Sequence, residues 1–426
     1  MPLGAKFRLV TIFGIFDVVI EARTETKMMV KMTKEEEEIL NKASHTIESN
    51  IHQTLSGRQF VATGGNQFRT FWTRDFCYSV PGLLKIGKAN LVKSQLSLIY
   101  KFKNAANLLP RGIDRIDPKI RVLFATVLPK AVRPSFSYSK EDEKFDQQIK
   151  GEYKGEHGTI AIDSNALFIL AYLNYAENTQ DYFLSPQQID SLFDIYRSRL
   201  TSGGVEQPPF SDWQDSVNRT GVWLLLQVQI LSALKKYYEW TTKEQSGFSI
   251  SKIEELILEN FYSKDENVFH QSKNSKVLAI DAYGFIFTNK LFLAKLSLPK
   301  LYQSLTSHAL WTKWTVPGVP VSEYYSSDEV SWTTKIVGLG GYHDHFHWGW
   351  LVAEAARISK LNGDQSEYLR VVNKFSTDIQ SAATLSEIYS LKGNSLVEHK
   401  SILYKSENPF TWTSAKWCEA LTAIPI

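Results

Sequence analysis

The sequence predicts an all-α protein in which about twelve helices pair as six hairpins and close into an (α/α)6 toroid. Apolar residues recur at helical spacing through most of the 426-residue chain, and Gly, Pro, Ser and Asn separate the periodic segments. Short connections alternate with long ones, as expected for antiparallel neighbours. β-Branched runs are confined to isolated pieces such as 121–127 and 278–287, so no parallel sheet can be built from them.

The first helix is predicted over 35–56. Thr33 and Glu36 form a capping-box pattern, and apolar residues then occupy every fourth position from Ala43 to Leu55. The same periodicity and punctuation predict the remaining helices. They are expected at 77–86, 88–103, 164–177, 186–199, 219–239, 250–261, 282–291, 297–305, 346–361, 365–386 and 413–423.

The composition is that of an ordinary globular protein, with 43% hydrophobic and 22% charged residues. The net charge of +3 is small for this length and is not concentrated in one block, so neither a nucleic-acid partner nor a membrane surface is expected. Aromatic residues make up 13% of the chain, and many stand beside carboxylates and histidines. Because sugar rings stack on aromatic faces, a carbohydrate is the expected partner, and the oligomeric state is left open.

One domain is predicted over 33–426, preceded by an N-terminal extension at 1–32. The longest apolar stretch lies in this extension, but Asp17 interrupts it and it is shorter than the roughly 20 residues of a membrane span. It resembles a weak secretory signal, and all four methionines fall in the extension, which allows a native start further downstream. Cys77 and Cys418 match no metal or redox pattern, which favours a reducing, cytoplasmic location over secretion.

Most of the acidic, histidine, tryptophan and arginine clusters fall in the long connections between predicted helices. A rigid ring that presents polar and aromatic loops at one end is a suitable scaffold for a carbohydrate site, because catalytic groups are commonly placed on loops held by rigid elements. These connections are 57–76, 104–163, 200–218, 306–345 and 387–412.

Asp212 and Asp215 flank Trp213 shortly before a predicted helix. Glycoside hydrolysis needs a carboxylic acid that protonates the leaving oxygen, and an aromatic wall helps to keep such an acid protonated by desolvating it. Asp215 is the better-placed candidate for the general acid, with Trp213 as a sugar-binding neighbour. The simpler structural interpretation is that Asp212, Ser216 or Asn218 only caps the following helix.

Glu387 stands at the predicted exit of helix 365–386, before a loop that leads to Trp412. An inverting base must lie about 6.5–9.5 Å from the acid to leave room for the attacking water, which suits two residues from different hairpins of a ring. Glu387 is therefore the candidate general base, and Trp412 a candidate sugar-binding residue. The simpler interpretation is a solvated glutamate at a helix end, and Glu398 and Glu323 are alternative bases.

The segment 340–350 alternates histidines with acidic and aromatic residues. His343 and His347 would share a face if the segment were helical, which is one way to hold a metal. The paired glycines at its start indicate a loop instead, and no cysteine or second histidine cluster supports zinc, so no metal and no cofactor are predicted. The preferred role is sugar binding, with Tyr342 and the histidines near the hydroxyls and Trp348 stacking on the ring.

Trp72, Arg74 and Asp75 immediately precede a predicted helix. An adjacent arginine and aspartate can grip vicinal hydroxyls, because together they supply donors and acceptors; the alternative is a structural ion pair. Asp163 precedes the predicted helix 164–177 and is a further candidate for substrate binding, although an N-cap role is the simpler explanation.

In their order along the chain, these segments resemble motifs of the toroidal glycoside hydrolases that include alkaline/neutral invertases, trehalases and amylo-α-1,6-glucosidase or glycogen-debranching enzymes. The resemblance extends over about residues 66–420. The segments that carry it are Trp72-Thr73-Arg74-Asp75-Phe76, Leu109-Pro110-Arg111-Gly112, Asp163-Ser164-Asn165, Asp215 with Gln229, Tyr342-His343 with Trp348-Gly349-Trp350, Glu387-Ile388-Tyr389 and Phe410-Thr411-Trp412.

The resemblance implies an inverting glycoside hydrolase with Asp215 as general acid and Glu387 as general base. Asp344-His345 and Gly349 depart from the motifs of these families, so the expected substrate is given only as a class, an α-linked glucoside or short oligosaccharide. Two other functions fit the same residues. A sugar epimerase or isomerase on this fold would depend on the histidines, and a non-catalytic carbohydrate-binding protein would need the aromatic residues alone.

Overall fold

The computed structural model describes residues 7–11, 14–18, 32–117, 120, 138–155, 157–243 and 247–425. Its contacts separate two units, Met1–Lys34 and Glu35–Ile426. In the first unit, β1 (Phe7–Thr11) pairs antiparallel with β2 (Gly14–Val18). The β-branched run 121–127 lies outside the described residues. In the described part of the chain, no helix is long and apolar enough to cross a bilayer.

The second unit is built around a closed ring of inner helices. Each inner helix packs against the next along the chain, and the last returns to pack against the first. The inner helices are α2 (Thr73–Lys85), α6 (Ser164–Thr179), α9 (Leu224–Thr241), α11 (Ile280–Thr288), α15 (Gly349–Leu361) and α17 (Thr411–Leu421).

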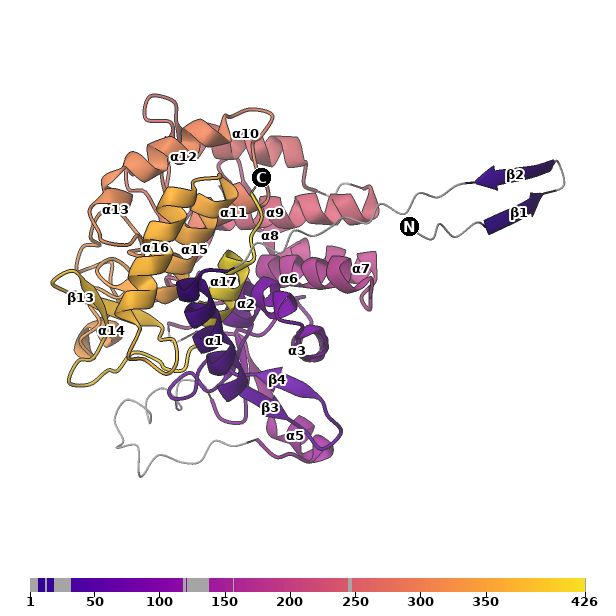
Figure 1. Cartoon of the computed structure of the whole chain (residues 1–426), viewed down its shortest axis with the longest axis horizontal. Helices are drawn as coiled ribbons and strands as arrows, with labels where there is room; N and C mark the ends of the chain where they lie inside the picture. Colours follow the sequence, from indigo (N-terminus) through magenta and orange to yellow (C-terminus); the bar gives the residue numbers. More distant parts are fainter. Residues whose placement is uncertain are drawn as a thin grey trace. The chain divides into compact units, whose positions relative to one another are not determined.

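An outer helical element precedes each inner helix in the sequence, and outer helices also pack on the inner helix that comes before them. Figure 1 shows one such contact, α16 beside α15, on the left of the body. This arrangement confirms the predicted all-α toroid of six hairpins. The outer elements are α1 (Lys34–Ser49), α3 (Ala89–Lys101), the run α7 (Pro186–Asp190), η2 (Ser191–Phe193) and α8 (Asp194–Arg197), then α10 (Ile250–Phe261), α12 (Leu298–Ser307) and α16 (Gln365–Asp378).

Burial explains which helices lie inside. Nearly every residue of α6 is buried, as expected for a helix covered on all sides, whereas α1 buries a single stripe that includes Ile39, Ala43 and Ile47. The tightest contact joins α2 to α17, where a Cβ added at Gly82 would lie 1.8 Å from the backbone oxygen of Ala415. Only glycine allows this close passage of two backbones.

Short antiparallel sheets hold the connections that enter the inner helices. They bring distant loops together: Trp72 pairs with Gly112 at the entrance to α2, and Trp348 pairs with Ile388 at the entrance to α15. The strands are β3 (Ile51–Gln53) with β4 (Gln59–Val61), β5 (Phe71–Trp72) with β6 (Gly112–Asp114) and β7 (Lys150–Glu152), β8 (Leu200–Thr201) with β9 (Gly204–Val205), β10 (Tyr262–Ser263) with β11 (Val268–Phe269), and β12 (His347–Trp348) with β13 (Ile388–Lys392) and β14 (Ser395–Glu398). Short helices α5 (Asp142–Gln148), α13 (Ala309–Thr312) and α14 (Trp332–Ile336) lie in the connections.

Two helices end well before their predicted ends, and one strand signal is wrong. The segment after α1 leaves the helix because it forms β3. The predicted helix 365–386 ends at Asp378, because Lys42 of α1 binds the backbone oxygens of Gln380 and Ala382 and holds that segment away from helical geometry. The strand signal at 278–287 is wrong, since α11 occupies most of it and its mixed apolar residues are buried among other helices.

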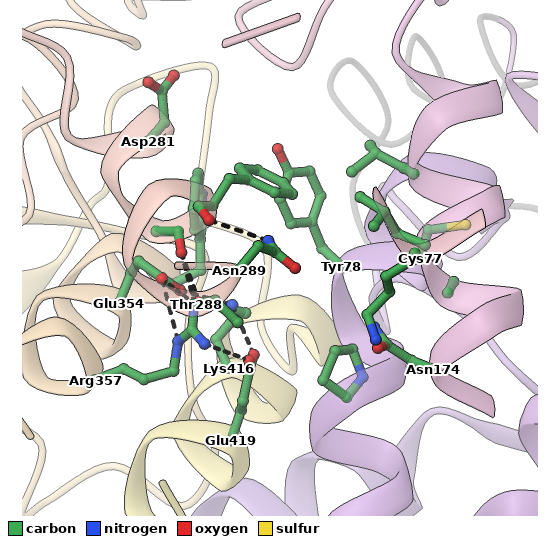
Figure 2. Close-up of a pocket in the computed structure, with 18 of the residues that line it drawn as sticks. Cys77, Tyr78, Asn174, Asp281, Thr288, Asn289, Glu354, Arg357, Lys416 and Glu419 are labelled. Atoms are coloured by element: carbon green, nitrogen blue, oxygen red, sulfur yellow. Dashed lines mark hydrogen bonds and ion pairs between the residues drawn. The ribbon is translucent and has the colours of Figure 1, made fainter. Parts of the chain in front are cut away.

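A buried ionic quartet joins α15 to α17 inside the ring, and Figure 2 shows it at the lower left. Lys416 Nζ lies 2.6 Å from Glu354 Oε2 and 2.7 Å from Glu419 Oε2. Arg357 Nη1 lies 2.8 Å from Glu419 Oε1, and its guanidinium also donates to Glu354. The quartet therefore balances two positive and two negative charges with little contact with water.

A cavity of about 410 Å³ adjoins the quartet and is lined by side chains of all six inner helices, so the axis of the ring is hollow. Figure 2 shows Tyr78, Cys77 and Asn174 across the cavity from Glu354 and Lys416. Neither candidate catalytic carboxylate lines this cavity.

Replacing Lys416 with methionine is expected to destabilise the protein by about 3–5 kcal/mol, because two buried glutamates would then share only Arg357. The free energy of unfolding in denaturant tests this. The control is Lys144→Met, which removes an exposed i,i+3 pair with Glu141 and should change stability by about 0–1 kcal/mol. Equal, small effects of the two variants would show that the quartet contributes little.

Candidate active site

The N-terminal ends of the inner helices meet at one end of the ring, and most of the predicted site residues lie there. Arg74 at the start of α2 contacts Asp163 at the start of α6, and Trp213, before α9, contacts Asp281 at the start of α11. Trp350 of α15 stacks on Trp412 of α17, with ring centroids 4.5 Å apart. Helix N-termini carry partial positive charge, so this end of the ring favours carboxylates.

Arg74 connects two of the carboxylates. Its Nε and Nη2 lie 2.7 and 3.0 Å from the two oxygens of Asp163, and its Nη1 lies 3.2 Å from Asp215 Oδ2. Asp163 does not cap α6 with its side chain, so the N-cap interpretation is wrong. Burial raises the pKa of Asp163, and the charge of Arg74 opposes that rise. This bidentate pair fixes the guanidinium that faces Asp215.

Asp215 lies between two arginines. Arg111 Nη2 is 3.0 Å from Asp215 Oδ2, and the Arg111 guanidinium in turn covers the ring of Trp72 at 4.6 Å. The Asp215 side chain is 29% exposed, so solvent still reaches it. Burial raises the pKa of Asp215, but the charges of Arg111 and Arg74 outweigh burial and hold this pKa below its usual value. Asp215 is therefore ionised near neutral pH in the unliganded protein.

Asp75 lies close to both candidate catalytic groups. Burial raises its pKa to about 7; the charge of Arg74 opposes the rise, and the charges of Asp215 and Glu387 add to it. Asp75 sits in the first turn of α2 rather than before the helix, because the extended pairing of β5 ends at Trp72. Asp215 and Glu387 therefore both lie within electrostatic range of Asp75, although these two residues come from loops far apart in the sequence.

Glu387 is held by two tyrosine hydroxyls. Tyr404 donates to its Oε2 at 2.6 Å, and Tyr342 donates to its Oε1. Burial raises the pKa of Glu387 to about 7, and the two tyrosine hydrogen bonds oppose that rise. The residue does not end a helix, as the simpler interpretation held. It lies in a bend just before β13, where its carbonyl accepts a hydrogen bond from Gly349.

The two alternative bases lie elsewhere. Glu398, on β14, accepts hydrogen bonds from Ser386 and Asn408, and Lys405 lies 3.3 Å from its carboxylate. Glu323 is exposed on the connection that follows α13. The charge of Glu387, by contrast, adds to the rise in the pKa of Asp75.

Aromatic rings line this end of the ring. Trp213 stands edge-on to both Trp348 and Trp350, with centroids 5.1 and 5.0 Å away, and Trp348 stacks parallel to His343 at 5.3 Å. Both ring nitrogens of His343 are buried without a hydrogen-bond partner, and burial lowers its pKa to about 3 although the charge of Asp215 opposes this. His343 is thus a neutral ring beside Asp215, with polar atoms available to a ligand.

The histidines do not form a metal site. His343 precedes β12, whereas His347 lies on it beside Trp314, so the two do not share a helix face. His345 stacks on Tyr324 instead, with centroids 3.8 Å apart. Among the described residues, no group of three or more metal-binding side chains comes together.

Sequence analysis did not identify several residues that fix the position of the candidate catalytic groups and their loops. Tyr404 is one, and Glu407 is another: its buried carboxylate accepts the backbone N–H groups of Gln67 and Phe68 at 2.8 and 3.1 Å. Its own backbone N–H points to Glu387 Oε2 at 3.4 Å, so Glu407 ties the loop before β5 to the loop that carries Glu387. Arg111 stood in a quoted motif, but nothing in the sequence pointed to its contact with Asp215.

Comparisons with known proteins support the fold. No protein-family model matches the sequence, and no curated protein matches it. Solved structures do match. A glycosidase variant in complex with glucose is 12% identical with a TM-score of 0.60, and the match covers 93% of this chain and 100% of the glycosidase. The GH63 mannosylglycerate hydrolase from Thermus thermophilus is 10% identical with a TM-score of 0.57, and the match covers 89% of this chain and 99% of that enzyme.

A rhamnosidase from Klebsiella oxytoca, solved with rhamnose bound, also matches, with 11% identity and a TM-score of 0.58. That match covers 91% of this chain but only 64% of the rhamnosidase. At these identities the comparisons establish the fold, which this chain shares with six-hairpin glycosidases.

Proposed function

We propose that the protein is an inverting glycoside hydrolase that cleaves an α-linked glucoside or short oligosaccharide. The observation that carries this proposal is that the charges of Asp215 and Glu387 both act on Asp75, beside a cluster of packed tryptophans. Glycoside hydrolysis requires two carboxyl groups, and this end of the ring supplies a candidate for each. The fold shared with solved glycosidases supports the same activity.

In the proposed reaction, Asp215 gives its proton to the leaving oxygen, while Glu387 takes a proton from the water that attacks the sugar carbon from the opposite face. Tyr342 and Tyr404 fix both oxygens of Glu387, so its free lone pairs point in a defined direction. Asp75 and His343 offer an acceptor and ring nitrogens for sugar hydroxyls.

The protonation states of Asp215 and Glu387 in the structure are opposite to those that the proposed reaction needs. Asp215 is ionised between its arginines, and the Glu387 carboxyl, with a pKa of about 7, is largely protonated below neutral pH. The pair therefore carries one proton over a wide range of pH, and the proposed reaction proceeds from the arrangement in which Asp215 holds it.

The pH profile of kcat/KM is expected to be a bell whose falling limb lies near pH 7, because the pair loses its last proton there. Its rising limb should lie at low pH, where Asp215 becomes protonated as well. Arg111→Met removes a positive charge beside Asp215, so it should raise the pKa of Asp215 and move the rising limb to higher pH. Arg58→Met, which removes a guanidinium paired with Asp142, is the control and should leave both limbs in place.

The epimerase alternative receives less support. Burial lowers the pKa of His343 to about 3 and that of His347 to about 4, so both rings are neutral and resist protonation near pH 7. A histidine that shuttles protons at a sugar works best with a pKa near the operating pH. A carbohydrate-binding protein, for its part, has no need for the buried Glu387 that two tyrosines orient.

Proton NMR of the protein with α-glucosides, sucrose, trehalose and malto-oligosaccharides tests the proposal. We expect a released sugar that appears first as the anomer opposite to that of the substrate. Interconversion of free monosaccharides without hydrolysis would favour the epimerase instead. Binding without any turnover of the panel would favour a carbohydrate-binding protein.

A further inference from the structure

The segment that contains α14 connects the loops of the two candidate catalytic residues. At one end it pairs with the chain just after Asp215: the N–H of Ser331 donates to the carbonyl of Ser216 at 2.8 Å, and Val330 forms a β-bridge with Val217. Trp332 follows this pairing directly. The pairing ends there, because Asp215 lies in a turn and Trp332 begins α14.

The other end of the segment meets the loop of the candidate base. The hydroxyl of Ser401 donates to the carbonyl of Val337 at 3.1 Å, and the N–H of Ser401 donates to the carbonyl of Tyr404 at 2.7 Å. This closes a tight turn with Ile402 and Leu403 at its tip. Tyr404 is the residue that holds Glu387, so α14 and this turn lie along one edge of the site.

The large apolar side chains on this edge are exposed. Trp332 and Ile336 stand one turn apart on α14 and are 65% and 61% exposed, and Ile402 and Leu403 are 100% and 47% exposed. We call these four residues the apolar rim. Exposed apolar groups occur singly on most proteins, but a cluster of them beside a site marks a surface that binds an apolar partner.

Polar side chains of the same edge are already engaged within the protein. Ser331 bonds to the hydroxyl of Thr333 at 2.7 Å, and Lys335 Nζ donates to the carbonyl of Ser327 at 2.7 Å. Ser401 is occupied with Val337, as described above. A sugar unit needs hydrogen bonds to its hydroxyls as well as a flat face, so this surface suits an apolar group better than a further sugar.

We propose that the apolar rim binds an apolar aglycone, the leaving group of the substrate. The inference rests on the proposed function. The leaving group must lie on the side of the proton donor, and Trp332 follows the pairing with the loop of Asp215. The substrate class is accordingly a glycoside with an alkyl or aryl aglycone, and the aglycone contributes to binding by covering the exposed indole and aliphatic side chains.

Octyl α-glucoside, below its micelle concentration, and methyl α-glucoside test this inference. The wild-type protein should bind the octyl glucoside at least about tenfold more tightly than the methyl glucoside in calorimetry, since methylene groups leave water. The double variant Trp332→Ala, Ile336→Ser should lose most of that preference and bind the methyl glucoside as before. Leu55→Ala, at an exposed leucine away from the rim, is the control and should retain the preference.

Equal binding of the two glucosides by the wild-type protein, or a preference that survives the double variant, would overturn the inference. A loss of maltotriose binding in the double variant, with the octyl preference intact, would overturn it in favour of a sugar subsite. Hydrolysis of the octyl glucoside is measured separately from binding. If the protein binds the octyl glucoside through Trp332 but does not hydrolyse it, the proposed function is refuted and the apolar rim remains a binding surface.

Discussion

Glu387→Gln should lower kcat by about 10²–10⁴-fold, the usual contribution of a general base, and should do so for every substrate that the protein hydrolyses. Glutamine keeps the size of the side chain; its amide oxygen can accept the hydroxyl bond of one tyrosine, and its NH2 group can donate to the hydroxyl oxygen of the other. It cannot take a proton from water. Because the attacking water needs activation whatever the leaving group, a more reactive substrate should not restore the rate.

Steady-state kinetics on the substrate identified by NMR measure this effect, and Glu398→Gln and Glu323→Gln are the matched controls. Glu323→Gln, at an exposed glutamate, should keep kcat within about threefold, because surface substitutions away from a site have small effects. Glu398→Gln alters a partly buried residue that accepts hydrogen bonds from Ser386 and Asn408, so it should lower kcat, but less than Glu387→Gln does. A loss of activity in Glu398→Gln with normal activity in Glu387→Gln would assign the base to Glu398. The melting temperature of each variant separates lost chemistry from lost folding.

Asp215→Asn is expected to reduce hydrolysis of ordinary O-glycosides by about 10²–10⁴-fold, but to slow hydrolysis of the corresponding glycosyl fluoride much less. Fluoride leaves without a proton from the protein, so the loss of the general acid matters only when the leaving oxygen needs protonation. The contrast between two substrates in one variant makes the assignment independent of how much folded protein is present.

The same experiment resolves the unusual protonation of the resting site. If Glu387 were the acid and Asp215 the base, the fluoride would rescue Glu387→Gln and not Asp215→Asn. The low pKa of Asp215 and the raised pKa of Glu387 make this a real alternative. Asp328→Asn, at a fully solvated aspartate, is the control and should leave both substrates unaffected.

Local sequence patterns predicted the fold well, because the apolar periodicity of each helix and the helix-breaking residues between helices can be recognised within short segments. They failed where a distant residue decides the local structure. Asp163 looks like a helix cap, but it binds Arg74, which is 89 positions away. The end of α16 depends in the same way on Lys42, which binds carbonyls about 340 positions further along the chain.

In the candidate site, too, local patterns were informative and contacts between distant residues were not predicted. Sequence motifs pointed to Asp215 and Glu387 as candidates, because Asp215 stands near Trp213 and Glu387 precedes a loop that leads to Trp412. The sequence did not indicate which groups shift the pKa values of Asp215 and Glu387. Arg111 reaches Asp215 across 104 positions, and Tyr404 stands in a loop that has no periodicity. Charge environment is a property of the folded ring, so the sequence named the acids without indicating how they are protonated.

The hollow axis of the ring has a consequence for hydration. The cavity of about 410 Å³ is large enough for water and is lined by charged side chains of α9, α15 and α17, so it suits bound water rather than an empty void. Its lining includes Trp350 and Asp281, whose Nε1 and Oδ1 atoms are buried without a hydrogen-bond partner in the protein and can bond to such water. Ala171→Leu, at a residue that lines the cavity, would fill part of this space and should reduce the number of waters held there.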